Sequence, residues 1–361
     1  MKSHYHVIIL GAGVSGLASF LFLKKNGIDD ILVIDKNDHN IHKACSGILT
    51  ERSIKLLDEI GINPSNYIKW SGVNAYYNNQ FSKSFPETIY AYQNSGLNRV
   101  SLDEEMFEKC KLENMEIVEN VKDIIIDEKH KLINKVNYDY LIDARGFSVI
   151  ANSFKKKIIG IEAKINDPKF NENKITPNIH LFNDLKGYGW VVSYNHELTI
   201  GFTDLYRKNI DLKSRLTEFA LQNRINLNDY EVDIRAGFVP IKPLYKLYKQ
   251  NTLYIGDRAG LNDPLTQEGI CYALLSSKLA AIAIKNEDLK YYQNSMKPII
   301  SSLKKANSYR KLFFKKSIQS KLWNISQKHG FTNYVFQKYS ELEFFDYTKL
   351  IKYHKEYKKA K

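Results

Sequence analysis

The stretch that decides the fold is VIILGAGVSG at residues 7–16, an apolar run that ends in three spaced glycines. A helix-like stretch follows to Asn26, and a second apolar run at residues 31–34 is closed by Asp35. This order of strand, glycine turn, helix, strand and acid is typical of a unit that binds a dinucleotide.

Each part of this turn has a predicted task. Gly11 lets the chain turn tightly, Gly13 lets the backbone approach a pyrophosphate, and Gly16 lets the helix pack closely on the strand. The amides at the start of the helix would face the phosphates, helped by the helix dipole. Asp35 can accept hydrogen bonds from a ribose hydroxyl. A glycine turn alone would also fit an ordinary strand–turn–helix unit that binds nothing.

A second signal lies about 240 residues further on, in GDRAGLNDPLTQEGI at residues 256–270. An apolar run ends at Asp257, a loop crosses, and a predicted helix opens at Gly269. That layout suits a flavin, since the Asp257 carboxylate could bind ribityl hydroxyls. The amides of Gly269 and Ile270 could stabilise negative charge on the pyrimidine edge of the reduced ring. The alternative is a surface aspartate before a helix, but two distant elements of this type seldom coincide.

Composition sets broad limits. The chain has 361 residues, of which 43% are hydrophobic and 26% charged, as in ordinary globular proteins. No apolar run approaches the roughly 20 residues that cross a bilayer. Three cysteines, Cys45, Cys110 and Cys271, form no disulfide framework, so we expect a reducing, cytoplasmic setting. Cys110 and Cys271 fall in predicted helices and are interpreted as structural.

The net charge of +13 is concentrated at the C-terminus. Residues 285–361 hold 17 lysines and one arginine against six acids. This segment is either a solvated basic tail or a surface that attracts an anionic membrane or an acidic electron donor. Residues 299–326 mix apolar and basic residues at helical spacing, which fits a membrane-surface helix or a helix packed on the protein.

The pattern predicts an α/β fold with an α+β second lobe. A Rossmann-like domain is expected from residues 1–150 and 250–285, a mostly antiparallel sheet domain from 151–249, and a basic helical segment from 286–361. The predicted helices cover residues 17–26, 51–60, 102–112, 212–223 and 269–284. The run at 70–92 is interpreted as strands and loops of the first lobe.

These motifs, together with Arg99 before a helix and the strand end at residues 143–146, resemble the FAD-dependent fold shared by hydroxybenzoate hydroxylase-type monooxygenases and geranylgeranyl reductases. The reductase branch is favoured by the cysteine loop KACSGIL at 43–49, the strand pair at 187–202 and the loop DPLTQEGI at 263–270. The chain departs from that branch where Trp190 is not followed by Pro and Lys, and where Gln267 replaces a usual glycine.

The resemblance implies an FAD enzyme that saturates carbon–carbon double bonds of polyprenyl chains. FAD would be reduced by NAD(P)H or a ferredoxin-like donor. The residues that would touch FAD by motif match are Ser15, Asp35, Cys45, Ser46, Gly47, Arg99, Asp257, Gly269 and Ile270, with Val121 near the adenine. The rival functions on the same scaffold are an aromatic-ring monooxygenase or halogenase, and a non-redox protein similar to lycopene cyclase.

Several residues keep two interpretations at this stage. Cys45 either positions or protonates the substrate, or is a small packed hydrophobe. Tyr188 and Trp190 line a tunnel for a hydrophobic or lipid substrate, or belong to the core of the second lobe. No metal site is expected, because His39 and His42 lie in a polar loop without matching ligands. No nucleic-acid recognition module is found.

Overall fold

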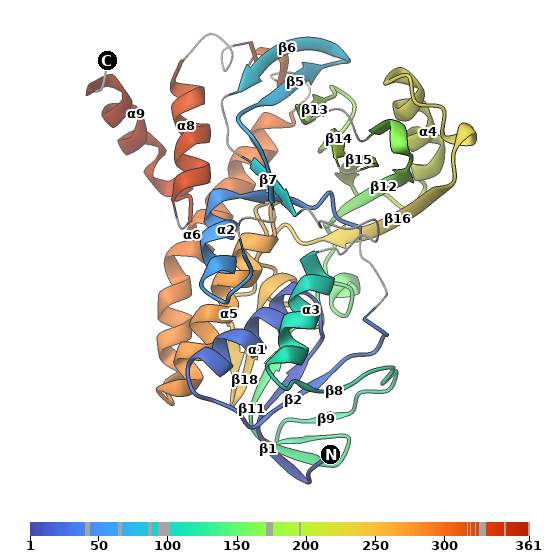
Figure 1. The fold of residues 1–361 in the computed structure, drawn as a ribbon. Coiled ribbons are helices and arrows are strands. Elements are labelled where there is room, and N and C mark those ends of the chain that lie inside the picture. The colour runs from blue at the N-terminus through green and yellow to red at the C-terminus, as the bar shows by residue number, and fades with distance from the viewer. Residues whose placement is uncertain are drawn as a thin grey trace.

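The computed structural model describes the chain except residues 40–43, 64–66, 86–88, 93–101, 171–175, 195, 316, 318, 322, 325–329, 343 and 360–361. Two main sheets contribute walls to one cavity, and helices from the C-terminal part of the chain run beside both (Figure 1). This is the mixed α/β architecture that the sequence predicts.

The first sheet has the strand order β17-β18-β11-β1-β2-β8. At its centre β1 (His4–Leu10) pairs in parallel with β11 (Val136–Asp143) and with β2 (Ile31–Ile34). β18 and β8 continue the parallel arrangement, whereas β17 and the hairpin β9–β10 are antiparallel additions. The remaining bounds are β8 Glu116–Val118, β9 Ile126–Asp127, β10 Leu132–Ile133, β17 Tyr248–Lys249 and β18 Thr252–Tyr254.

Both faces of the central strands are buried. Successive side chains of a strand point to opposite faces. Val7 and Ile9 pack on the side of α1 (Val14–Lys25) and α5 (Ile270–Lys285), whereas Ile8 packs with the strands of the β9–β10 hairpin. This two-sided burial explains the unbroken apolar runs of the sequence. Cys110 of α3 (Leu102–Leu112) and Cys271 of α5 are buried in the same helical layer, as expected for structural cysteines.

The second sheet has the order β16-β12-β15-β14-β13-β5-β6, antiparallel except between β13 and β5. Its inner apolar side chains pack beneath α4 (Leu212–Gln222), and its other face forms a wall of the cavity. The strand bounds are β5 Val73–Tyr77, β6 Gln80–Phe85, β12 Ile158–Asn166, β13 Asn178–Leu181, β14 Tyr188–Tyr194, β15 Glu197–Leu205 and β16 Val232–Val239.

The predicted limits of the first domain, 1–150, need one correction. Strands β5 and β6 lie within that range but belong to the second sheet, because β5 pairs with β13 at Asn74 opposite Asn178. Such pairing between distant segments leaves no local mark in the sequence. A small third sheet, β3-β7-β4, joins the two parts. Its strands are β3 Ile48–Thr50, β4 Tyr67–Trp70 and β7 Ile89–Tyr92, and α2 (Glu51–Asp58) follows β3.

The C-terminal segment is built from α6 (Leu289–Phe313), α8 (Gly330–Glu341) and α9 (Leu350–Lys359). The apolar side of α6, including Met296, is buried in the same cluster as α1 and α5. For α6 the structure therefore agrees with the packed-helix interpretation. Among the described residues, no helix combines the length and the hydrophobicity needed to cross a membrane.

Candidate active site

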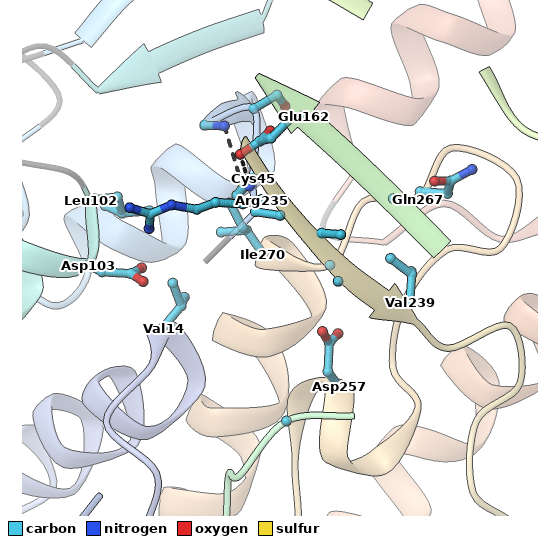
Figure 2. Close-up of a pocket in the computed structure, with 18 of the residues that line it drawn as sticks. Val14, Cys45, Leu102, Asp103, Glu162, Arg235, Val239, Asp257, Gln267 and Ile270 are labelled. Atoms are coloured by element: carbon cyan, nitrogen blue, oxygen red, sulfur yellow. Dashed lines mark hydrogen bonds between the residues drawn. The ribbon is translucent and has the colours of Figure 1, made fainter. Parts of the chain in front are cut away.

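One large cavity collects most of the predicted site residues. Its volume is about 1550 Å³, and its walls come from the β1–α1 turn, the end of β2, the loop 44–48, the start of α5 and the second sheet (Figure 2). The predicted residues that line it are Gly11, Ser15, Asp35, Cys45, Ser46, Gly47, Tyr188, Trp190, Asp257, Gly269 and Ile270. Segments about 240 residues apart thus meet at one site, as the two motifs require.

The glycine turn is too crowded for side chains. Gly11 has a φ of 103°, and a Cβ placed there would lie 2.6 Å from the Ala144 carbonyl oxygen. A Cβ on Gly16 would lie 1.8 Å from the Gly11 carbonyl oxygen. Both positions therefore need glycine if α1 is to begin this close to the sheet. This close turn fits the phosphate-binding cradle that the sequence predicts.

Two helix N-termini meet at the cavity. α1 begins after Gly13 and α5 begins after Gly269, and among the described residues neither start is capped by a side chain. The two helices are tied together, since the Ser277 hydroxyl donates to the Ser15 carbonyl oxygen at 2.7 Å. Unsatisfied amides and aligned dipoles favour anionic groups at both starts. The arrangement fits a pyrophosphate at α1 and the electron-rich edge of a reduced flavin at α5.

Besides its predicted contact with a ribose, the Asp35 carboxylate accepts hydrogen bonds from the backbone. Its Oδ2 accepts a hydrogen bond from the Ala12 amide at 2.5 Å, and its Oδ1 accepts one from the Asn37 amide at 2.8 Å. The carboxylate therefore holds the glycine turn while it lines the cavity. Carboxylate oxygens have further lone pairs, so a ribose hydroxyl can share this acceptor.

The cysteine loop and the start of α5 both line the cavity. Cys45 is exposed to the cavity, and its Sγ accepts a hydrogen bond from the Gly47 amide at 3.4 Å. Desolvation by the surrounding protein, followed by the charge of Glu162, raises the pKa of the Cys45 thiol to about 11. Cys45 is therefore a neutral thiol at pH 7, with a proton to give rather than a thiolate ready to attack.

Among the described residues, three predicted ones do not line the cavity: Gly13, Gly16 and Val121. Gly13 is the N-cap of α1, and Gly16 is buried in its first turn. Val121 packs on the hairpin side of the first sheet, and its amide donates to the Asp35 carbonyl oxygen at 3.0 Å, so that amide is already used. Arg99 lies outside the described residues.

The sequence analysis missed a polar part of the cavity. Along β12 the side chains of Glu162 and Lys164 line the cavity, whereas Ala163 and Ile165 pack beneath α4. Two-residue alternation of this kind is visible in the sequence and could have marked the strand's polar face. The other missed residues with polar side chains that line the cavity include Asp103, Arg235, Asn262 and Gln267.

Two arginines near the site, Arg145 and Arg258, form ion pairs with a buried aspartate. Arg145 Nε donates to Asp143 Oδ1 at 2.8 Å, and Arg258 Nε donates to Asp143 Oδ2 at 2.8 Å. Asp143 is buried at the end of β11, so the two guanidinium groups neutralise its charge. The two ion pairs account for the positions of both guanidinium groups.

A buried ion pair anchors the loop before α5. Arg52 of α2 is fully buried and pairs with Glu268, while its guanidinium lies over the Tyr339 ring at 4.3 Å. The Tyr339 hydroxyl donates to Glu268 Oε2 at 2.9 Å, and the Tyr347 hydroxyl donates to the buried Asp263 at 2.9 Å. The C-terminal segment thus holds the loop that precedes Gly269.

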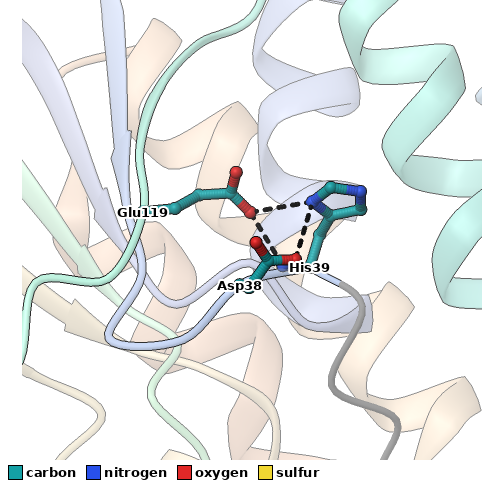
Figure 3. Close-up of side chains that lie close together, drawn as sticks. All are labelled: Asp38, His39 and Glu119. Atoms are coloured by element: carbon teal, nitrogen blue, oxygen red, sulfur yellow. Dashed lines mark hydrogen bonds and ion pairs between the residues drawn. The ribbon is translucent and has the colours of Figure 1, made fainter.

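A separate cluster lies at the end of β2. Asp38, His39 and Glu119 place their ligand atoms within 4.8 Å of one another, so the expectation that His39 has no matching groups nearby was wrong (Figure 3). His39 Nδ1 lies 3.1 Å from Glu119 Oε1, which also accepts the His39 amide at 2.8 Å. The His39 ring stacks on Phe107. These contacts account for the cluster's geometry, and His42 lies outside the described residues.

Comparison with known proteins agrees with this geometry. Residues 4–147 match the family described as FAD binding domain. The chain is an FAD-dependent oxidoreductase. It is 22% identical to digeranylgeranylglycerophospholipid reductase 3 of Methanosphaera stadtmanae, covering 78% of each chain. It is 23% identical to menaquinone reductase of Mycolicibacterium smegmatis, covering 78% of this chain and 76% of the relative.

Solved structures show the same fold at low identity. A geranylgeranyl bacteriochlorophyll reductase-like protein of Thermoplasma acidophilum superposes with a TM-score of 0.74 at 17% identity, covering 99% of both chains. A flavin-dependent brominase superposes with a TM-score of 0.72 at 16% identity, covering 99% of this chain and 100% of the brominase. The fold is therefore shared by flavoproteins with different chemistry.

Proposed function

We propose that this oxidoreductase uses FAD to reduce carbon–carbon double bonds of a prenyl lipid of geranylgeranyl type, or of a related hydrophobic substrate. The relatives named as reductases support this substrate class, because their names refer to lipids with isoprenoid chains. The loop with Cys45 also supports it, since it supplies a neutral thiol beside an apolar wall.

The observation that carries the proposal is that apolar wall. Val73, Ile89 and Val192 line the cavity and pack into one cluster with Trp190 and Ile48, which follows the cysteine loop. An isoprenoid chain laid along this wall would bring an alkene to the Cys45 thiol while excluding water.

The protein's own residues divide the work as follows. The starts of α1 and α5 would bind the anionic parts of FAD, and Asp35 and Asp257 would take its ribose and ribityl hydroxyls. Reduced FAD supplies a hydride. Cys45 would give the proton that the second alkene carbon needs, since its thiol is protonated at neutral pH.

The test is product mass under anaerobic conditions. The purified flavoprotein, reduced chemically, is incubated with a geranylgeranyl lipid, and the product is expected to gain about two mass units per reduced bond. The Cys45→Ala variant is the matched control for the proton donor. Oxygen uptake with a hydroxylated or halogenated product would support the rival monooxygenase or halogenase. A rearranged product of unchanged mass would support a non-redox activity.

The electron donor and the location are further proposals. NAD(P)H or a ferredoxin-like protein would reduce the flavin, and the basic C-terminal segment would bring an acidic donor or an anionic membrane close. The exposed lysines of α9, Lys352, Lys355 and Lys358, allow a test without disturbing the packed α6. Their replacement by glutamine should reduce co-sedimentation with anionic liposomes. Unchanged co-sedimentation would count against the membrane contact.

A further inference from the structure

Glu162 is a buried acid that is not among the residues proposed to bind FAD. It lies on β12, faces the cavity, and has 1% of its surface exposed (Figure 2). Its Oε1 accepts a hydrogen bond from the Cys45 amide at 2.7 Å. Its Oε2 is sealed from solvent and has no hydrogen-bond partner among the described residues. An ionised carboxylate with one buried oxygen unpaired is strongly disfavoured, so this geometry favours the neutral acid.

The charges around Glu162 oppose this effect only in part. Lys164 Nζ, on the same strand, lies 4.0 Å from Glu162 Oε1. Arg235 lies directly opposite on β16, but it is paired with Asp233 at 2.6 Å. On the other side β15 presents Gly201, which adds no charge. Desolvation is the largest influence and raises the pKa of Glu162, with Lys164, the Cys45 amide and Arg235 lowering it and Asp233 raising it.

Cys45 needs such a neighbour if it is to act as an acid. A thiol whose pKa is about 11 cannot stay ionised at neutral pH, so a proton given away must be replaced. Glu162 is an ionisable group that holds the cysteine loop by a direct hydrogen bond to the Cys45 backbone. A carboxylic acid is a much stronger acid than a thiol and can reprotonate it quickly.

We propose that Glu162 is protonated at rest and is the source from which Cys45 regains its proton after the thiol has protonated the substrate. The Cys45 S–H bond breaks as a C–H bond forms at one alkene carbon, and the Glu162 O–H bond then breaks as the S–H bond forms again. The carboxylate regains its proton from water when the product leaves. The hydride for the other carbon comes from the flavin chemistry, so this inference rests on the proposed function. Glu162 acts through Cys45 and is a positioning residue.

The first test reads the proton directly and needs no substrate. Glu162→Gln keeps a side-chain oxygen that can accept the Cys45 amide but removes the acidic proton. The infrared difference spectrum of the wild-type holoenzyme minus this variant should contain a protonated-carboxyl band at pH 7, which disappears at higher pH. Glu218→Gln, on the exposed side of α4, is the control and should show carboxylate bands alone. Carboxylate bands alone for Glu162 at pH 7 would overturn the inference.

The second test reads the coupling to Cys45. The pH profile of Cys45 alkylation by iodoacetamide should shift to lower pH in Glu162→Gln. At the alkaline pH where the thiol titrates, Glu162 has lost its proton, and the variant lacks the negative charge that raises the thiol pKa. Cys45→Ala identifies the signal of this cysteine. An alkylation profile identical to that of the wild type would contradict the coupling.

The third test uses steady-state kinetics to distinguish a role of Glu162 in the proton path from a purely structural role. In Glu162→Gln we expect kcat to fall with KM unchanged, and Glu162→Asp to restore part of it. In the wild type kcat should fall as pH rises through the titration of Glu162, and this limb should be missing in Glu162→Gln. An unchanged kcat in Glu162→Gln would overturn the inference. If the wild type reduces no prenyl lipid, the proposed function fails, and the infrared and alkylation results still decide whether Glu162 keeps a proton beside Cys45.

Discussion

Acidification should destabilise this protein through one buried histidine. His180 of β13 has 2% of its surface exposed, and its ring stacks on Tyr76 with centroids 4.6 Å apart. Phe219 meets the same ring edge-on at 5.1 Å. Neither ring nitrogen has a hydrogen-bond partner among the described residues. Desolvation therefore lowers the pKa of His180 from 6.5 to about 4.

The sign and size of the effect follow from proton linkage. Between about pH 6.5 and 4 the unfolded chain carries the imidazole proton and the folded chain does not. The stability linked to His180 is therefore complete above pH 6.5 and is lost as pH falls towards 4. Each pH unit of difference between the two pKa values is worth about 1.4 kcal/mol, so the loss amounts to ~3 kcal/mol.

The matched variant is His180→Phe, which keeps an aromatic ring in the stack and removes the titration. Urea unfolding of both proteins, followed by circular dichroism, gives the free energy of unfolding at each pH. The variant should gain ~3 kcal/mol relative to the wild type between about pH 7 and 4. A difference that stays constant over this range would refute the assignment of a neutral, buried His180.

Three further outcomes test the site. Gly16→Ala should yield folded protein without bound flavin, because the new Cβ would lie 1.8 Å from the Gly11 carbonyl oxygen. The absorbance spectrum of the purified variant measures bound flavin, and circular dichroism measures folding. Arg52→Ala should lower the free energy of unfolding by about 3–5 kcal/mol in urea titrations, because it leaves Glu268 without its buried partner. An unchanged unfolding curve would show that the pair does not anchor the loop. Cys45→Ala should keep FAD but slow alkene reduction in single-turnover assays, and a wild-type rate would remove Cys45 from the proton path.

The sequence predicted the parts of the site that are formed by residues close to one another in the chain. The glycine turn and Asp35 lie within one strand–helix–strand unit, and crowding at Gly11 and Gly16 is a property of that unit. Asp257 and the start of α5 were likewise visible as a strand end followed by a helix. The cysteine loop was placed by family resemblance, and the structure puts it on the cavity wall.

The rest depends on contacts between distant residues. Nothing near Asn74 in the sequence indicates that β5 pairs with β13, and nothing near Glu162 indicates that it meets Cys45. The C-terminal tyrosines that hold the loop before α5 look like ordinary helix residues. At Gln267, which replaces a usual glycine, the backbone keeps a left-handed φ of 62°, so this local geometry needs no glycine.

The most direct test of the account is the absorbance spectrum of the purified, folded protein with and without added FAD. The account predicts a yellow protein that binds one FAD per chain, held where the start of α1 meets the start of α5. A folded protein that stays colourless and takes up no added FAD would contradict it.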